Sequence, residues 1–211
     1  MQRKSWAGTA RPRRWQHRLF LDAVKKEGLN ACVVHPSGIL GPQDYAVGET
    51  TGTIIKIING EMPIGMGGSF NLCDVRDLAA GCIAAADKGR KGECYILGNE
   101  EVTLKKMCEL LDKDLHCGTC KFYLPLGLAK LLAKADGEKG SENRCESIDD
   151  DIFCTTIWKR NNAFDYSKAE KELGYHTRSY AETLHDEAVW LRAEGKLHKG
   201  SGKKKFITEI L

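Results

Sequence analysis

The sequence predicts an α/β fold built on a parallel β-sheet. Two stretches carry this prediction. In the first, an amphipathic helical pattern stops at Gly28 and a short buried strand follows at residues 31–35, too short and too β-branched for a helix. In the second, a helix of small residues at 78–88 precedes a buried strand at 93–97. Helix followed by strand is half of a βαβ unit, so both strands are expected to be largely buried and parallel in one sheet.

Between these two strands the sequence predicts helices separated by turns. A short helix is expected at 53–59, ending at Gly60, and a turn at 65–68, where three of four residues are glycine. Residues 70–73 are expected to be extended. Asp77 is expected to cap the helix 78–88, with Gly89 just past its end.

The rest of the chain is mostly helical in pattern. Thr103 is expected to cap an amphipathic helix with apolar residues at helical spacing (Leu104, Met107, Leu110, Leu111). Another helix is expected from Pro125 to about residue 135, then a polar loop at 136–151. Two capping-box patterns predict the starts of a short and a longer helix (Ser167 to Glu170, Ser179 to Glu182).

Composition limits the function classes. The chain has 211 residues, 42% hydrophobic and 29% charged, enough for one core with a satellite lobe. Its net charge of +3 is too small to indicate a nucleic-acid partner. The nine cysteines are odd in number and several lie in apolar runs, which predicts reduced thiols and a cytoplasmic location. No stretch predicts a membrane span or a secretory signal.

The first 18 residues form an atypical basic segment. Residues 1–21 contain six arginines or lysines and no acidic residue, with Trp6 and Trp15 among them. Three interpretations compete: an organelle transit peptide, a nucleic-acid-binding arm, and a poorly ordered tail or a sequence that does not belong to the fold. The last is the simplest.

Residues 31–42 and 70–80 together resemble the extended short-chain dehydrogenase/reductase family, which includes nucleotide-sugar epimerases and dihydroflavonol-reductase-like enzymes. The resemblance implies that the loop after strand 31–35 packs beside the nicotinamide of NAD or NADP. It assigns His35, Pro36 and Ser37 to cofactor contact, and Asp74 and Arg76 to substrate contact. Without it, Pro36 to Gly38 would simply be a strand-ending turn. Asp77 is explained by a helix start.

A second resemblance covers residues 161–178, where Lys168-Ala169 and Glu172-Leu-Gly-Tyr175 match the small helix and turn of that family's substrate lobe. The expected role is architectural. The spacing Gly38-x-x-Gly41 is not a dinucleotide fingerprint, because Pro42 and the polar residues after it do not open a helix.

The expected architecture is an incomplete Rossmann-like, doubly wound parallel sheet with a small C-terminal substrate lobe. Residues 19–120 would form the late part of the Rossmann-like domain, 121–197 the mostly helical lobe, and 198–211 a basic tail. The resemblance implies NAD(P)-dependent oxidoreduction or epimerisation of a hydroxyl or carbonyl group on a small-molecule substrate, with nucleotide sugars among the candidates.

Two family elements are missing from the sequence: the Gly-rich turn that holds the pyrophosphate, and Tyr-x-x-x-Lys, expected near Thr9 and Arg13. The sequence therefore predicts a truncated or frame-shifted, catalytically incompetent chain that is poorly soluble or homo-oligomeric.

Two alternatives remain open. One is a non-catalytic binding or regulatory protein. The other is a metal or thiol module on Cys117 and Cys120, which lacks the second cysteine pair of a structural zinc site.

Overall fold

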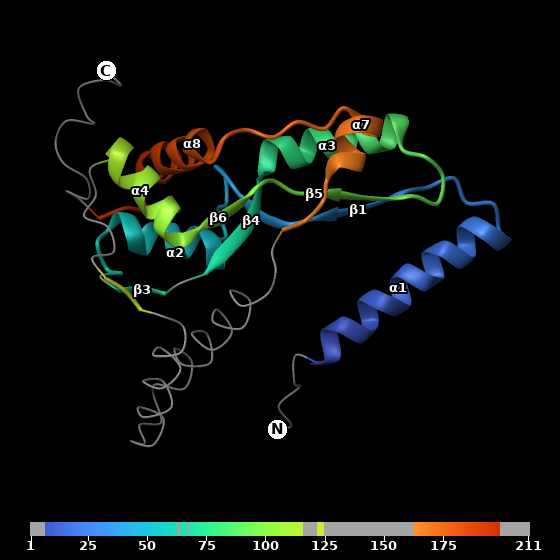
Figure 1. The fold of residues 1–211 in the computed structure, drawn as a ribbon, viewed down its shortest axis with the longest axis horizontal. Coiled ribbons are helices and arrows are strands. Elements are labelled where there is room, and N and C mark those ends of the chain that lie inside the picture. Colours follow the sequence, from blue (N-terminus) through green and yellow to red (C-terminus); the bar gives the residue numbers. More distant parts are fainter. Residues whose placement is uncertain (1–6, 63, 67, 116–121, 125–162, 199–211) are drawn as a thin grey trace.

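A computed structural model describes residues 7–62, 64–66, 68–115, 122–124 and 163–198. The chain forms short, mostly parallel strands with helices on both sides (Figure 1). The expected α/β class is confirmed. The predictions for residues 125–162 and for the basic tail from residue 199 onward fall outside the described residues.

Strand β1 (Val33–Pro36) pairs in parallel with β5 (Cys94–Leu97), with Val33 opposite Cys94 and Pro36 opposite Leu97. The predicted pairing of the two strands is therefore confirmed. Tyr95 is fully buried, whereas Val33 and Ile96 are only half-buried, so the burial expected on this sheet holds for one of its two faces.

Strand β2 (Gly38–Leu40) pairs in parallel with β4 (Ser69–Asp74), and β4 pairs antiparallel with β6 (Glu101–Thr103). β1 and β2 are separated only by Ser37. The continuous segment 33–40 thus pairs first with β5 and then, after Ser37, with β4.

The turn predicted at 65–68 is wrong in its first half, because β3 (Ile64–Met66) is a strand that pairs in parallel with β7 (Phe122–Leu124). A partner almost sixty residues away decides this conformation, and no local pattern reveals it. Gly65 serves close approach here: a Cβ at Gly65 would lie 2.9 Å from Cε1 of Tyr123.

Six helices have described bounds: α1 (Ala7–Lys26), α2 (Glu49–Ile58), α3 (Val75–Lys88), α4 (Leu104–Leu115), α7 (Ser167–Leu173) and α8 (Tyr180–Ala193). α1 includes most of the basic segment 1–18, so residues 7–18 are helical. It ends as predicted just before Gly28, whose φ of 75° is left-handed.

The helix caps show which sequence predictions were correct. Thr103 Oγ1 accepts from the amide of Lys106, and Ser179 Oγ from that of Glu182, as predicted. Asp77 is not the cap of α3: Asp74 is, accepting from the amide of Arg76 at 2.8 Å, and the helix begins three residues earlier. Ser167 is the first residue of α7 rather than its cap; its own amide donates to Asp165.

Two apolar clusters hold the fold together. The larger joins β2, β4 and β6 to α2, α4 and α8, with Ile54, Leu111 and Leu184 almost fully buried. The smaller joins Tyr95 and Leu97 of β5 to Ala85 of α3 and Leu173 of α7. α3 and α7 thus cover one face of the β1–β5 pair, and α1 lies on the other side (Figure 1).

None of the described helices combines the length and the apolar character that a membrane span requires.

Candidate functional site at the β1–β2 junction

The chain changes sheet partner at Ser37. The Ser37 amide donates to the carbonyl of Leu97 at 3.1 Å, completing the β1–β5 ladder, and at the next residue β2 begins to pair with β4. The carboxyl ends of β1 and β5 therefore lie where the two pairings diverge. In open α/β sheets this is the place where ligands bind.

The three residues expected to contact a cofactor lie at this junction. His35 and Pro36 are exposed at the carboxyl end of β1, and Ser37 is half-buried. The Ser37 hydroxyl donates weakly to the carbonyl of Gly38 at 3.4 Å. The side chains of His35 and Pro36 are thus available to a ligand, although cofactor contact itself remains a prediction.

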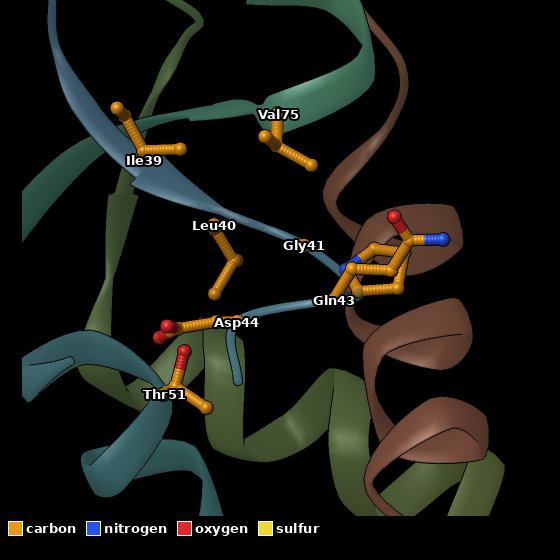
Figure 2. A pocket seen from close by; sticks show the side chains of 8 residues that line it. Ile39, Leu40, Gly41, Gln43, Asp44, Thr51 and Val75 are labelled. Carbon is orange, nitrogen blue, oxygen red and sulfur yellow. The ribbon is translucent and has the colours of Figure 1, made fainter. Parts of the chain in front are cut away.

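A pocket of about 460 Å³ opens directly after β2 (Figure 2). Its wall combines apolar side chains with three polar ones that the sequence did not single out, Gln43, Asp44 and Thr51. The lining residues are Ile39, Leu40, Gly41, Pro42, Gln43, Asp44, Thr51 and Val75. The loop is backbone-strained, because Gln43 and Val47 adopt φ values of 75° and 54°, which residues with a Cβ rarely do.

Two carboxyl groups at the polar corner of this pocket, Asp44 and the nearby Glu187, have shifted pKa values. The Thr51 hydroxyl donates to Asp44, and together with the amide of Gly48 at 2.7 Å it holds the pKa of Asp44 below its usual value. Glu187 of α8 lies behind the corner, fully buried, and both carboxylate oxygens lack a hydrogen-bond partner among the described residues. Burial raises the pKa of Glu187 to about 8.

Nothing in the sequence marks these pocket residues as functional. Asp44 stands in an aperiodic loop, and Glu187 follows a capping box on a helix whose pattern predicts only packing. Burial of Glu187 depends on α2 and β2, which lie more than a hundred residues earlier in the chain.

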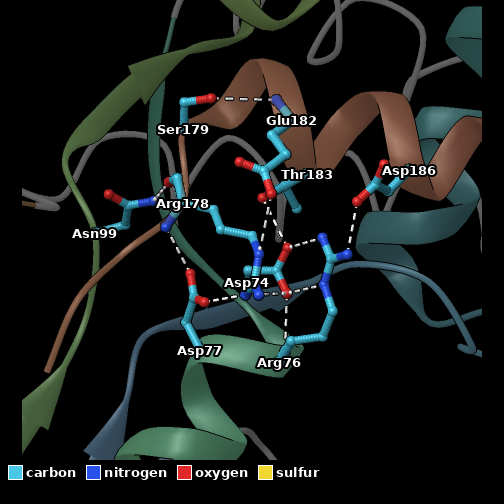
Figure 3. A network of polar contacts seen from close by, with 9 residues as sticks. All are labelled: Asp74, Arg76, Asp77, Asn99, Arg178, Ser179, Glu182, Thr183 and Asp186. Atoms are coloured by element: carbon cyan, nitrogen blue, oxygen red, sulfur yellow. Dashed lines mark hydrogen bonds and ion pairs between the residues drawn. The ribbon is translucent and has the colours of Figure 1, made fainter.

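The residues expected to contact substrate, Asp74 and Arg76, face each other at the start of α3 (Figure 3). Arg76 donates from Nε to Asp74 Oδ1 at 2.9 Å and from Nη2 to Oδ2 at 2.7 Å. Thr183 Oγ1 donates to the same carboxylate at 2.8 Å, and Arg76 also pairs with Asp186 at 2.6 Å.

This network fixes the charge of Asp74. The side chain is fully buried, which raises its pKa, but the hydrogen bonds from Arg76 and Thr183 outweigh burial and lower the pKa overall. Both carboxylate oxygens already have partners. Asp74 and Arg76 therefore join α3 to α8, and their predicted contact with substrate remains a prediction.

Asp77 belongs to the same network. It accepts from the backbone amide of Arg178 at 2.6 Å and also pairs with that residue's guanidinium, while Glu182 contacts Arg178 Nε at 3.2 Å (Figure 3). The segment entering α8 is thereby anchored to the first turn of α3.

The described residues fit one end of a dinucleotide better than the other. The junction offers exposed His35 and Pro36 at strand ends, suitable for a nicotinamide. A pyrophosphate needs a helix N-terminus with free amides. α3 and α4 both follow strands, but Asp74 and Thr103 occupy their first amides, and neither turn contains glycine. The segment Gly38–Leu40 is a strand, so Gly38-x-x-Gly41 is no fingerprint, as predicted.

Known proteins resemble this chain in sequence. A putative dihydroflavonol 4-reductase of Synechocystis sp. is 29% identical over 189 residues, which are 86% of this chain and 53% of that protein. Sterol demethylase protein B of Methylococcus capsulatus is 26% identical over 186 residues, 86% of this chain and 55% of its own length. The chain spans about half the length of the curated relatives it matches. No protein-family model matches it.

Solved structures resemble it in fold. The structure of gox2253 superposes with a TM-score of 0.69 at 25% identity, covering 86% of this chain and 55% of that one. A nucleoside-diphosphate-sugar epimerase from Pseudomonas aeruginosa, PA4631, has a TM-score of 0.66 at 24% identity over 87% and 54%. WbmF of Bordetella bronchiseptica, solved with NADH, has a TM-score of 0.62 at 18% identity over 85% and 51%.

The resemblance to extended short-chain dehydrogenases/reductases is confirmed. Both expected kinds of relative are found, a dihydroflavonol-reductase-like protein and a nucleotide-sugar epimerase. In each case the match covers most of this chain and about half of the other protein. The chain has part of the Rossmann-like fold of this short-chain dehydrogenase/reductase family. Among the solved structures that resemble it in fold, RMD from Pseudomonas aeruginosa is complexed with NADPH and WbmF with NADH.

Proposed function

We propose that this chain is the part of an NAD(P)-dependent oxidoreductase or epimerase that presents the nicotinamide-side loop and the substrate lobe. The substrate would be a small molecule with a hydroxyl or carbonyl group, in the class of nucleotide sugars. The observation that carries the proposal is the change of sheet partner at Ser37, which leaves His35 and Pro36 exposed at the strand ends.

In this proposal, His35, Pro36 and Ser37 border the nicotinamide. The bound dinucleotide would supply hydride transfer. Pro36 has no amide hydrogen, so it presents only an apolar ring surface to a flat ligand. The Ser37 hydroxyl, whose present bond to the carbonyl of Gly38 is weak, could turn from that carbonyl to a carboxamide.

The pocket beyond β2 would hold the substrate. The pocket begins at Ile39 of β2, two residues after Ser37, so a ligand in it would lie on the same side of the chain segment as the proposed nicotinamide position or close beyond it. Asp44 stays ionised at neutral pH and accepts hydrogen bonds from hydroxyl groups, which suits a sugar. Asp74 and Arg76 would affect substrate binding indirectly, because their contacts with Thr183 and Asp186 hold α8 in place.

The 211 residues by themselves would be catalytically incompetent. They contain no tyrosine followed four residues later by lysine, and so supply no phenolate for proton exchange with the substrate. Without a Gly-rich turn, the pyrophosphate contributes little to binding.

The test is nuclear magnetic resonance of the purified chain titrated with NAD⁺, NADH, NADP⁺ and NADPH. Weak binding with shifts centred on residues 35–40 is expected, together with loss of those shifts in Pro36→Ala and their retention in the distant control Ser167→Ala. Calorimetry should give no low-micromolar dissociation constant. Shifts confined to other parts of the chain, or measurable oxidoreductase turnover, would contradict the proposal.

A further inference from the structure

Three side chains with metal-binding atoms meet beside the β1–β5 pair. His17 comes from α1, His35 from β1 and Cys94 from β5, and one ligand atom of each lies within 4.8 Å of the other two. The two imidazole rings have centroids 5.9 Å apart and are tilted by 43°. His17 and Cys94 are half-buried and His35 is exposed.

Strand register explains why these side chains converge. Val33 lies opposite Cys94, and His35 is two residues further along β1, so His35 and Cys94 point to the same face of the pair. Tyr95 and Leu97 point to the other face, which α3 and α7 cover. α1 lies on the first side of the pair (Figure 1), and its residue His17 has a ligand atom within 4.8 Å of those of His35 and Cys94.

We propose that His17, His35 and Cys94 form a zinc site that joins α1 to the sheet. Two imidazole nitrogens and one thiolate are a ligand set typical of Zn²⁺, with a water as the fourth, tetrahedral ligand. The exposure of His35 leaves that fourth position open to solvent.

The geometry needs little adjustment. Zn–N bonds of about 2.0–2.1 Å and a Zn–S bond of about 2.3 Å place tetrahedral ligand atoms about 3.3–3.6 Å apart. The observed spread of 4.8 Å or less therefore closes by about 1 Å per pair, within reach of side-chain rotation. Coordination releases the thiol proton of Cys94 to solvent, and no oxidant or reductant takes part.

A metal here would have a structural effect. The zinc ion would join α1 to both strands, because its three ligands are separated in sequence by 18 residues (His17 to His35) and by 59 residues (His35 to Cys94). Metal that binds the folded chain stabilises it by mass action, so zinc at a hundredfold excess over its dissociation constant is expected to raise the melting temperature by about 5–10 °C.

The experiment removes the competing thiols first. Cys117→Ser/Cys120→Ser eliminates the only Cys-x-x-Cys spacing in the sequence, and the metal-free protein is titrated with Co²⁺ and Zn²⁺. One equivalent should bind, with intense tetrahedral Co²⁺ bands and a thiolate-to-cobalt absorption. His17→Ala, His35→Ala and Cys94→Ser, each added to this background, should each weaken zinc binding at least tenfold and abolish the rise in melting temperature.

Cys82→Ser is the matched control, because Cys82 is an exposed free cysteine on α3, away from the site. It should leave every readout unchanged. Circular dichroism verifies that the variants fold. Zinc binding lost with Cys117 and Cys120, zinc binding unaffected by Cys94→Ser, or a cobalt spectrum without a thiolate band would overturn the proposal. No dinucleotide enters these measurements, so the outcome is separate from that for cofactor binding. With zinc bound, the His35 imidazole is taken by the metal, and only Pro36, Ser37 and the backbone of His35 would border the nicotinamide.

Discussion

The carboxylate of Asp77 accepts a hydrogen bond from the backbone amide of Arg178 at 2.6 Å, across 101 residues of sequence. The bond joins the first turn of α3 to the segment that leads into α8. Since Asp77 is also paired with the Arg178 guanidinium and is largely buried, the contact anchors the C-terminal helices to the Rossmann-like part.

Replacing Asp77 is therefore expected to loosen the C-terminal helices. Asp77→Ala leaves the part-buried amide of Arg178 without its acceptor and removes one of the carboxylates around that residue's guanidinium, which costs about 1–3 kcal/mol of the free energy of unfolding. Urea denaturation followed by circular dichroism measures this. Asp87→Ala, an exposed change on the same helix, should stay within about 0.5 kcal/mol. Equal effects of the two substitutions would show that the Asp77 contact contributes nothing specific.

Two buried tyrosines offer a matched pair. The hydroxyl of Tyr180 accepts from the amide of Leu72 at 3.0 Å and donates to the carbonyl of Glu100 at 2.7 Å, linking β4 to the start of β6. The hydroxyl of Tyr175 is buried with no hydrogen-bond partner among the described residues. Removing each hydroxyl should therefore have opposite consequences.

Tyr180→Phe is expected to cost about 1–3 kcal/mol in the free energy of unfolding, because the Leu72 amide stays buried without an acceptor. Tyr175→Phe should be neutral or stabilising, since it removes an unsatisfied polar group. Thermal and urea unfolding of both variants measure the difference. If Tyr175→Phe proves as costly as Tyr180→Phe, the hydroxyl of Tyr175 has a partner that this structure does not show.

Local patterns predicted much of the fold correctly because their causes are local. The caps at Thr103 and Ser179 are hydrogen bonds to amides three residues away, so the sequence alone reveals them. β1 and β5 were found because short β-branched or aromatic runs beside glycine favour strands. β3 was missed because its partner β7 is distant in sequence, and glycine-rich segments favour turns when no partner is known.

The site was predicted less completely. The resemblance placed His35, Pro36 and Ser37 at a strand end, and the structure puts them at the junction of two pairings. Asp74 and Arg76 were recognised as charged residues at a helix start, but their partners Thr183 and Asp186 lie 109 and 110 residues away. The assignment of the cap to Asp77 was wrong because α3 begins at Val75, which puts Asp74 at the cap position and Asp77 inside the first turn, where its carboxylate binds the distant Arg178.

Glu187 gives the chain an unusual dependence of stability on pH. Burial raises its folded pKa from 4.5 to about 8, so the folded state holds a proton that the unfolded state releases. The contribution of Glu187 to the free energy of unfolding is complete below pH 4.5 and is lost as the pH rises toward 8. Since one unit of pKa shift corresponds to about 1.4 kcal/mol, the total loss is a few kcal/mol at most.

Glu187→Gln removes this titration. The variant should be more stable than the wild type at pH 8. Between pH 4.5 and 8 its free energy of unfolding should change with pH only through the groups that both proteins share. Urea unfolding across that range measures the difference curve. The exposed change Glu194→Gln on the last turn should reproduce the wild-type slope. A difference curve without slope would mean that Glu187 is ionised in the folded chain.

The outer face of α1 is expected to drive self-association. Trp15 and Leu19 flank His17 at two residues on either side, so they point away from the sheet, and they are 64% and 54% exposed. Among the described strands, β1 and β5 pair only with each other, so each presents one unpaired edge. Exposed apolar helices and unpaired strand edges promote association between copies.

Light scattering of the purified chain should therefore report an oligomer or larger aggregates. Trp15→Gln/Leu19→Gln should lower the mass toward that of a monomer, since it removes the apolar part of the contact. Ile83→Gln is the matched control: Ile83 is 65% exposed on α3, on the opposite side of the sheet, and its replacement should not change the mass. A wild-type chain that is monodisperse and monomeric, with a cooperative melt, would instead favour a self-sufficient binding module, because its apolar helix and strand edges would then not need a second copy to cover them.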